Sequence, residues 1–547
     1  MRVLFVAFSK PWTPFNSSVA ALAGVVRAAG HEPVALALPL DVGPTQGAWF
    51  AATLRPDLVC VTAMTRDAPV ARALLPLLRA RTGAPVVVGG YHATFSPRDF
   101  AVLDGVDAIG IGEGERALRA LLDDLVRGTM RTRPGLWVRG PRGFEGEPPP
   151  PDPEPDIAAL PPWDYEALGD VRAMLDHGIN TLGPVQDRYL PLRASRGCPY
   201  GCAYCSAPSW NGLHRNGWRR NVLPVEQLCD EAARLRDRWH PDGFEMWDEH
   251  FPIDERWLRE LATRWPERVG LPFRIEWHPA AASRERLRLV REAGCELVHV
   301  GVEVGDPELR RRTLLRRQSD ELLERVFADA RALGLATSAS VMVGVPGERA
   351  DQVERTVALL ERLRPDSFMW SNYTPLPGTA LARARADGAV GPDAPPEHEL
   401  KPEERSRLHG RLAELSTRLA GASPRPRRID APKTAASASG LDGTPSETLR
   451  RALEPAGRRI ETARWEGRTL LLEIALSDGS MRRVRLGPAD GSPAYRVCGP
   501  LRLAYDGERL DDELRAILDA WSRAIEGWTL ERLRVLQPGD DRWVPPS

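Results

Sequence analysis

The sequence lacks a surplus of either charge, a long apolar run and a rich supply of cysteine. Its 547 residues contain 74 Lys and Arg against 75 Asp and Glu, a balance that gives no electrostatic footprint for bulk nucleic acid or an anionic membrane. No apolar run reaches the length of about 18 residues that a transmembrane helix needs. The apolar start at residues 3–8 is too short for a signal peptide. We therefore expect neither a transmembrane segment nor a signal peptide.

Cysteine is scarce, with seven in the chain, and four of these are scattered: Cys60, Cys229, Cys295 and Cys498. Scattered cysteines fit buried thiols better than disulfides, since two of them, Cys60 and Cys295, border apolar runs. Buried thiols are typical of a reducing compartment, so we expect a cytoplasmic protein.

The remaining three cysteines lie close together, as Cys198-x₃-Cys202-x₂-Cys205. Glycine and proline between the first two prevent regular helix or strand, so the three thiolates sit on one tight loop. Such a loop suits an iron–sulfur cluster and leaves its fourth iron without a protein ligand. Structural zinc is one alternative, but it takes four ligands, and the closest further candidate, His214, stands nine residues after Cys205. Three unrelated buried thiols are the other alternative.

An aromatic residue, Tyr204, precedes the last cysteine, and the loop resembles the cluster loop of radical S-adenosylmethionine enzymes. The resemblance implies a 4Fe-4S cluster held by Cys198, Cys202 and Cys205, with Tyr204 among the cofactor contacts. The open iron would chelate the amino and carboxylate groups of S-adenosylmethionine, and electron transfer would cleave it to a 5′-deoxyadenosyl radical. An external electron donor of the flavodoxin or ferredoxin type is implied as well.

Residues 1–128 alternate buried strands with amphipathic helices, which predicts a doubly wound, Rossmann-like α/β domain. Its ligand should lie beyond the carboxyl ends of the strands. The expected strands are 3–8, 33–38, 58–62, 85–89 and 108–111. The residues at and just after the carboxyl ends of the last three are small, hydroxylated or imidazole-bearing, and include Thr62, Thr65, Gly89, Gly90, His92, Gly112 and Gly114. They fit close approach to a ligand, although tight turns of any such fold look alike.

The series Gly-Gly-x-His-x-Thr at 89–94 and Val-Asp-x-Ile-x-Ile-Gly-Glu-Gly-Glu at 106–115 is similar to the cobalamin-binding domain that precedes many radical S-adenosylmethionine barrels. It implies cobalamin held by the seven residues above. The better-known signature Asp-x-His-x-x-Gly is absent after the first strand, where residues 10–15 stand instead. No histidine is therefore available there to ligate cobalt. His92 is either a cofactor contact or a turn histidine bonded to backbone.

A proline-rich connector, 129–187, leads to a second strand–helix pattern over 188–385. Its expected strands are 189–195, 243–247, 273–277, 297–302, 337–343 and 367–373. Six such units are fewer than the eight of a closed barrel, and the radical family resembles this in its open (β/α)6 barrel. Residues 386–445 read as one helix, 402–419, and a flexible linker. Residues 446–547 read as a small α+β domain of unassigned role, with a hairpin at 469–486 and helices at 510–525 and 530–535.

Four residues near the carboxyl ends of the barrel strands are candidate contacts of S-adenosylmethionine. Glu249 follows the second strand and offers a carboxylate for its ammonium group; the alternative is a solvated acidic turn. The resemblance implies that Glu303, in Gly-x-Glu-x-Gly, faces the ribose and methionine part. It also implies that Arg317 approaches the carboxylate and that Ser340 reaches the ribose. The arginines of 310–312 and 316–317 otherwise fit a solvated helix face.

The resemblance implies a cobalamin-dependent radical S-adenosylmethionine methyltransferase. Such an enzyme transfers a methyl group from methylcobalamin to a substrate radical, formed when the 5′-deoxyadenosyl radical abstracts hydrogen. A non-methylating rearrangement, cyclisation or oxidation and a non-catalytic cobalamin-binding protein remain alternatives. A methylthiotransferase is disfavoured, because that class carries a second cluster in an N-terminal domain that here has only Cys60. No catalytic residue is assigned, and the substrate is expected to be a small molecule or peptide.

Overall fold

The structure of the protein is a computed structural model, which describes residues 1–9, 15–40, 42–151, 156–169, 171–177, 188–213, 221–386 and 402–422 and five strands beyond 458. The described residues form two compact units, which are taken here one at a time. The first unit holds those within Met1–Pro149, Trp163–Met174 and Asp430–Ser547, and the second those within Pro150–Pro162 and Leu175–Ile429. No helix in the described part of the chain is long and apolar enough to cross a membrane.

The N-terminal sheet of the first unit has six strands in the order β2-β1-β3-β4-β5-β6. All pairs are parallel except that of β5 with β6. The strands are β1 (Arg2–Ser9), β2 (Glu32–Pro39), β3 (Leu58–Thr62), β4 (Val86–Gly89), β5 (Ala108–Gly110) and β6 (Leu136–Val138). The predicted doubly wound domain is confirmed. β6 lies within 129–187, so the sheet extends past the expected boundary at residue 128.

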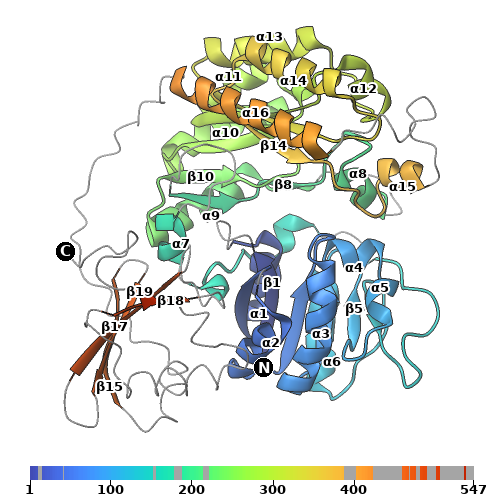
Figure 1. Ribbon diagram of the computed structural model, residues 1–547, viewed down its shortest axis with the longest axis vertical. Coiled ribbons are helices and arrows are strands. Elements are labelled where there is room, and N and C mark those ends of the chain that lie inside the picture. Colours follow the sequence, from blue (N-terminus) through green and yellow to red (C-terminus); the bar gives the residue numbers. More distant parts are fainter. Residues whose placement is uncertain are drawn as a thin grey trace. The chain divides into compact units, whose positions relative to one another are not determined.

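Alternate side chains of β1 enter two different cores, which is why the sheet carries helices on both faces. Leu4, Val6 and Phe8 pack with residues of α2 (Pro44–Thr53) and α3 (Ala68–Thr82). The intervening Val3, Phe5 and Ala7 pack with residues of α1 (Ser17–Ala28) and α6 (Glu115–Val126). Figure 1 shows these helices around the blue strands. Because β1 lies between β2 and β3, the strand order reverses there, and ligands of such sheets bind beside this point.

The second unit is built on six parallel strands in the order β14-β13-β12-β11-β10-β7. They are β7 (Tyr189–Leu192), β10 (Gly243–Met246), β11 (Phe273–Trp277), β12 (Cys295–Glu303), β13 (Ala336–Val343) and β14 (Ser367–Asn372). The predicted open six-unit barrel is thereby confirmed. Since all six strands run the same way, their carboxyl ends lie at one edge of the sheet.

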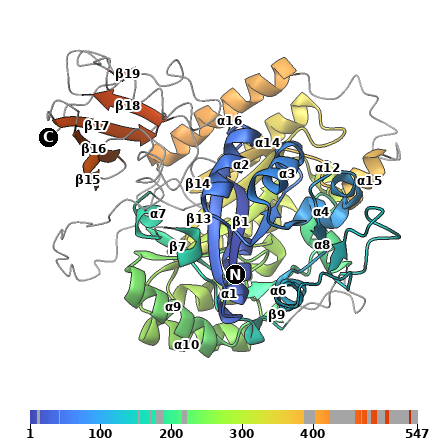
Figure 2. The same ribbon diagram turned by 90° about the horizontal axis from the view of Figure 1, so that it is seen from below.

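Helices cover one side of this sheet. They are α9 (Val225–Trp239), α10 (Glu255–Arg268), α11 (Arg284–Glu292), α13 (Asp320–Ala332), α14 (Ala350–Leu363) and α16 (Pro402–Ala422). α9 and α10 lie side by side, as Figure 2 shows. α16 contacts α14 and β14, and its Leu408 and Leu412 are fully buried. The helix expected from the sequence at 402–419 is therefore a packed part of this unit.

The C-terminal residues form a five-stranded sheet in the order β15-β16-β17-β18-β19. Its strands are β15 (Arg459–Glu466), β16 (Thr469–Ala475), β17 (Met481–Pro488), β18 (Leu501–Tyr505) and β19 (Val535–Leu536). β16 and β17 pair in antiparallel fashion, as the predicted hairpin requires. The helix expected at 510–525, and all but the last residue of the one expected at 530–535, lie outside the described residues.

Candidate cofactor sites

In the first unit, the turn after β3 packs against the turn after β4, and the contact is made by Gly90. Gly90 has φ +91°, in the region that favours glycine. A Cβ at this position would stand 2.8 Å from Thr62 Oγ1 and 3.0 Å from Ala63 N. Only a glycine allows this approach, so Gly90 fixes the spacing of the two strand ends.

Hydrogen bonds extend this arrangement to β5. The Thr94 hydroxyl donates to Gly90 O at 2.9 Å and accepts from Gly112 N at 3.0 Å. Ala63 N donates to Gly89 O at 3.0 Å. Gly112 has φ +79°, and Gly114 is the residue before α6. The predicted set Thr62, Gly89, Gly90, Gly112 and Gly114 is thus held at one edge of the sheet.

His92 lies in this edge, on the short helix α4 (Tyr91–Phe95), and is buried. Its Nε2 lies 3.0 Å from Asp99 Oδ2, and its ring meets Phe100 edge-on. The ring therefore bonds to a carboxylate, not to backbone as one interpretation of the sequence had it. With Nε2–H donating to Asp99, Nδ1 is left as an acceptor, and it has no hydrogen-bond partner. The Thr65 hydroxyl is likewise buried without a partner.

These residues fit cobalamin, whose corrin carries many amide side chains. The glycines open the backbone to close approach, while Thr65 Oγ1 and His92 Nδ1 are polar atoms without a hydrogen bond. Residues 10–14, at the end of β1, lie outside the described residues.

In the second unit, the acidic residues after β10 hold the start of the cysteine loop. The Ser195 hydroxyl donates to Asp248 Oδ1 at 2.5 Å, and Ala194 N donates to Asp248 Oδ2 at 3.2 Å. Gly197 N donates to Glu249 Oε2 at 3.1 Å. Burial raises the pKa of Asp248 to about 6, although both hydrogen bonds oppose the shift. Glu249 is thus tied to the loop backbone, while its side chain is exposed, as the alternative of a solvated acidic turn expects.

The three cysteines of this loop interact electrostatically. Burial raises the pKa of the Cys205 thiol to about 12, and Cys202 and Cys198 add to the increase. Ionising one thiol is therefore opposed by its neighbours, a cost that bound iron would remove. In the described residues no group of three or more His, Cys, Asp or Glu is placed to hold a metal ion. The ligand set thus stays a prediction, which three soft thiols on one loop fit; His214 lies outside the described residues.

Glu303 ends β12 in an unusual backbone conformation. Its φ is +69°, rare for a residue with a side chain, and the pairing with β13 shifts register between Gly301 and Glu303. The Glu303 carboxylate lies 3.5 Å from Arg316 Nη1, with both side chains buried. Burial raises the pKa of Glu303, while Arg316 and a hydrogen bond from Tyr204 oppose the increase.

The structure places Arg316, not Arg317, beside Glu303. Arg316 Nη2 donates to Gly301 O at 2.7 Å, and Nη1 donates to Tyr204 OH at 3.2 Å and Cys202 Sγ at 3.5 Å. Arg317 is exposed and does not take part in this contact, so its role toward the carboxylate of S-adenosylmethionine stays a prediction. The cause is local: α12 (Pro307–Arg312) ends before this pair, and Leu315 turns the chain with φ +54°.

Ser340 lies on β13, where it is the register partner of Gly301 on β12. Gly301 stands two residues before Glu303, so Ser340 lies near the same edge of the sheet as Glu303. Its side chain is half-buried. The structure therefore brings Cys202, Tyr204, Glu303 and Arg316 into direct contact, with Ser340 on the neighbouring strand.

Sequence reasoning missed three further groups at this edge. Tyr200, between the first two cysteines, stacks on His278 with ring centroids 3.7 Å apart. Burial, and then Arg316 and His250, lower the pKa of His278 to about 3. Burial and the charge of Glu303 raise the pKa of Glu276 to about 7. The pattern Glu-Trp-His marks a strand end in the sequence, but it gives no sign that a residue of the cysteine loop stacks there.

Two family models match the chain. The Radical SAM superfamily matches residues 192–360, and the B12 binding domain matches residues 2–122. The chain thus contains two cofactor-binding domains, both of the α/β class. It carries a radical S-adenosylmethionine domain and a B12-binding domain, and the cofactors of the two domains are a 4Fe-4S cluster, S-adenosylmethionine and cobalamin, as predicted.

Relatives with known names are distant. An uncharacterised methyltransferase of Pyrococcus horikoshii is 27% identical over 345 residues, which is 60% of this chain and 68% of that protein. An anaerobic magnesium-protoporphyrin IX monomethyl ester cyclase of Rubrivivax gelatinosus is 26% identical over 409 residues, 71% of this chain and 70% of that one. The structure of the methyltransferase TsrM from Kitasatospora setae, solved with cobalamin and a 4Fe-4S cluster, has a TM-score of 0.55 at 22% identity. It covers 72% of this chain and 79% of its own.

Proposed function

We propose that this protein is a cobalamin-dependent radical S-adenosylmethionine methyltransferase. The observation that carries the proposal is the joining, in one chain, of a B12-binding domain to a radical S-adenosylmethionine domain whose Cys202, Glu303 and Arg316 meet at the strand ends. When bound, the cluster and S-adenosylmethionine supply the radical that abstracts a substrate hydrogen, and cobalamin supplies the methyl group. Two relatives are named as methyltransferases, a bacteriochlorophyllide d C-8(2)-methyltransferase and a cytidylyl-2-hydroxyethylphosphonate methyltransferase, and these names support the proposal.

The residues of the second unit divide into those that hold the cluster and those that orient S-adenosylmethionine. Cys198, Cys202 and Cys205 provide thiolates on one loop. Arg316 places a buried positive charge near the carboxylate of the methionine part, while its own N–H groups bond within the protein. Glu249, tied to the loop through Gly197 N, offers a carboxylate to the ammonium group.

Glu303 and Ser340 stand on neighbouring strands and fit the ribose. The Tyr204 hydroxyl, which bonds to both Glu303 and Arg316, holds these two charges in fixed relation. In the first unit, Thr62, Thr65, His92 and the glycines at 89, 90, 112 and 114 form the cobalamin contacts. Fixed positions matter because radical chemistry demands that reacting groups be held close and water be kept away.

A cyclase-like reaction is the second candidate, because the magnesium-protoporphyrin ester cyclases match over 71% of this chain. The two candidates need the same cofactors and differ in the fate of the methyl group. A methyltransferase consumes S-adenosylmethionine in two ways and yields S-adenosylhomocysteine together with 5′-deoxyadenosine. A cyclase of the radical type yields 5′-deoxyadenosine alone.

The test uses the full chain, reconstituted anaerobically with iron, sulfide and cobalamin and reduced by flavodoxin or dithionite. S-adenosylmethionine carrying a trideuterated methyl group is incubated with a panel of small molecules and peptides, and products are read by mass spectrometry. We expect both nucleoside products and a substrate heavier by one labelled methyl group. 5′-Deoxyadenosine without label transfer would favour the cyclase-like reaction, and failure to form any cluster would favour a non-catalytic cobalamin-binding protein.

A further inference from the structure

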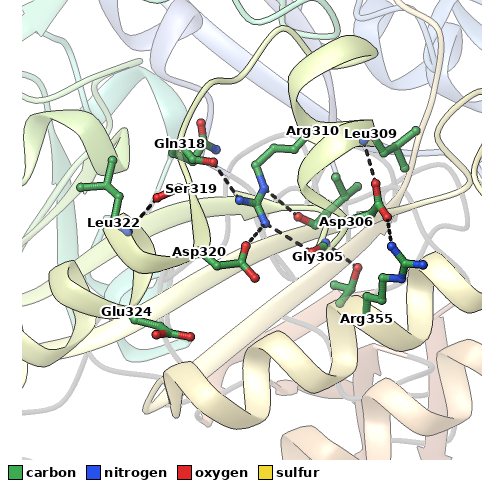
Figure 3. A network of polar contacts seen from close by, with 12 residues as sticks. Gly305, Asp306, Leu309, Arg310, Gln318, Ser319, Asp320, Leu322, Glu324 and Arg355 are labelled. Carbon is green, nitrogen blue, oxygen red and sulfur yellow. Dashed lines mark hydrogen bonds and ion pairs between the residues drawn. The ribbon is translucent and has the colours of Figure 1, made fainter.

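A buried arginine organises the segment between β12 and α13. Arg310, on α12, is fully buried, and its guanidinium donates to Val304 O at 3.0 Å, Gly305 O at 3.4 Å and Gln318 O at 2.9 Å. It also pairs with Asp320 at 2.9 Å. Figure 3 shows the guanidinium at the centre of these contacts. Arg310 thus joins the start of the segment to its end.

A second set of contacts anchors the segment to α14. Asp306 caps α12 by accepting from Leu309 N at 2.8 Å, and Arg355 Nη1 donates to its other oxygen at 2.6 Å (Figure 3). Gly305 N donates to Thr356 Oγ1 at 2.7 Å. A Cβ on Gly305 would stand 2.3 Å from Thr356 Cα, so the two backbones are in contact. The segment is fixed at both ends and along its side.

The contacts continue from Arg310 to Arg316. Arg316 N donates to Arg310 O at 2.9 Å. The Gln318 amide, oriented with its oxygen toward Arg316, accepts from Nε at 2.7 Å and Nη2 at 3.3 Å. Arg310 in turn holds the backbone of Gln318. Two buried residues, Arg310 and Gln318, therefore hold Arg316 on the side away from the cysteine loop.

The front of the same guanidinium faces the cysteine loop. Arg316 Nη1 lies 3.5 Å from Cys202 Sγ, and Ala203 N donates to Leu314 O at 3.0 Å, which holds loop and segment together. Arg316 is 5% exposed, so little solvent screens its charge. A positive charge and an N–H donor beside a cluster sulfur stabilise the reduced cluster, which is more negative, and so raise its reduction potential.

We propose that Arg316 donates a hydrogen bond to the Cys202 sulfur in the cluster-bound protein and raises the reduction potential of the cluster. Arg310 and Gln318 are positioning residues for this contact. The proposal rests on the proposed function in one respect, that the three cysteines hold the cluster. It adds a task that is separate from binding S-adenosylmethionine, because the effect on potential exists before that molecule binds.

The test compares the wild type with Arg316→Gln, Arg316→Lys and Gln318→Leu, each reconstituted anaerobically in full length and assayed for iron and sulfide. S-adenosylmethionine is left out, so that a loss of its binding cannot affect the result. The cluster is titrated with dithionite in the presence of redox mediators, and the reduced fraction is read by electron paramagnetic resonance. Arg317→Gln is the matched control, since it removes the same charge from the adjacent, exposed residue.

We expect Arg316→Gln to move the midpoint to a more negative potential, so that a smaller fraction is reduced at a given poise. Arg316→Lys keeps the charge and should give a smaller shift in the same direction, as should Gln318→Leu. Arg317→Gln should titrate as the wild type. Equal midpoints for wild type and Arg316→Gln would overturn the proposal while leaving the function standing. If Arg316→Gln takes up no iron, Gln318→Leu decides, and an unshifted midpoint there counts against the proposal. If the wild type formed no cluster, both this proposal and the proposed function would be refuted.

Discussion

Gly301 and Glu303 are fitted to each other: a Cβ on Gly301 would stand 2.5 Å from the Glu303 Oε1 atom. The same Cβ would lie 3.2 Å from Arg316 Nη2. The glycine of this Gly-x-Glu pattern thus leaves room for the end of the Glu303 side chain and for the arginine with which that side chain pairs. It is not required by its own backbone angle.

Replacing Gly301 by alanine should displace this ion pair. The added methyl group has no room, and overpacking of a buried site costs about 1–3 kcal/mol. We expect Gly301→Ala to lower the free energy of unfolding by about that amount and to weaken S-adenosylmethionine binding, measured by denaturation and equilibrium binding. Gly410→Ala is the control: it lies in α16 with nothing within 4 Å of the added Cβ, and alanine there should stabilise the helix by up to ~1 kcal/mol. Equal effects of the two variants would refute the steric argument.

Replacing Gly90 by alanine should disturb the cobalamin edge of the first unit. Alanine at φ +91° and ψ −172° costs on the order of 1–3 kcal/mol in backbone strain, and its Cβ would stand 2.8 Å from Thr62 Oγ1. We expect lower cobalamin retention after gel filtration, read from the visible spectrum. Gly43→Ala meets no neighbour within 4 Å and should retain cobalamin as the wild type does. Full retention by Gly90→Ala would show that this edge does not hold the cofactor.

Replacing Arg310 by methionine should destabilise the second unit strongly. The change leaves three carbonyl oxygens without their donor, and each buried group left unsatisfied costs about 1–3 kcal/mol; it also removes the ion pair with Asp320, which keeps its pair with Arg362. Chemical denaturation measures the loss. Arg311→Met, on the exposed side of the same helix where Arg311 pairs with Glu308, should change the free energy of unfolding by less than about 0.5 kcal/mol. Similar losses in both variants would contradict the assignment of Arg310 as the buried hub.

Stability should fall in acid partly through His299. Burial in β12 lowers the pKa of this imidazole to about 4, so the folded protein binds the proton less readily than the unfolded chain, whose histidines titrate near 6.5. Stability is therefore lost as pH falls from about 6.5 to about 4, by roughly 3 kcal/mol for this group. His299→Leu should flatten the dependence of unfolding free energy on pH over this range. His240→Asn, which changes an exposed histidine, should keep the wild-type slope; a slope that His299→Leu leaves unchanged would rule out this origin.

The positions of the strands in the two parallel sheets follow from features that are visible in the sequence. Each strand is a short apolar run between turn residues, as Leu58–Thr62 illustrates by its agreement with β3. Such runs are buried on both faces and have few alternatives. The cysteine loop and the Gly-x-Glu pattern are equally local. These signals need no knowledge of what packs against them.

The site residues that escaped prediction depend on contacts between distant segments. Which of Arg316 and Arg317 lies beside Glu303 depends on the turn at Leu315. This residue has a positive φ although it is not a glycine, so the sequence gives no sign of the turn. The run at 310–312 and 316–317 was read as a possible solvated face, yet Arg310 and Arg316 are buried while Arg311, Arg312 and Arg317 are exposed. Charge alone carries no information on burial when the partners are carbonyl oxygens of nearby turns and strand ends, such as those of Val304, Gln318 and Gly301.

The two-sided anchoring of the segment around Arg310 has a consequence for engineering. The contacts of Arg310, Arg316 and their neighbours Gly305 and Asp306 link β12, α12, the residues up to Asp320, one turn of α14 and the cysteine loop. A designer who wished to transplant the Glu303–Arg316 pair into another barrel could not move two side chains alone. The graft would have to carry this whole module, helix α12 and the facing turn of α14 included.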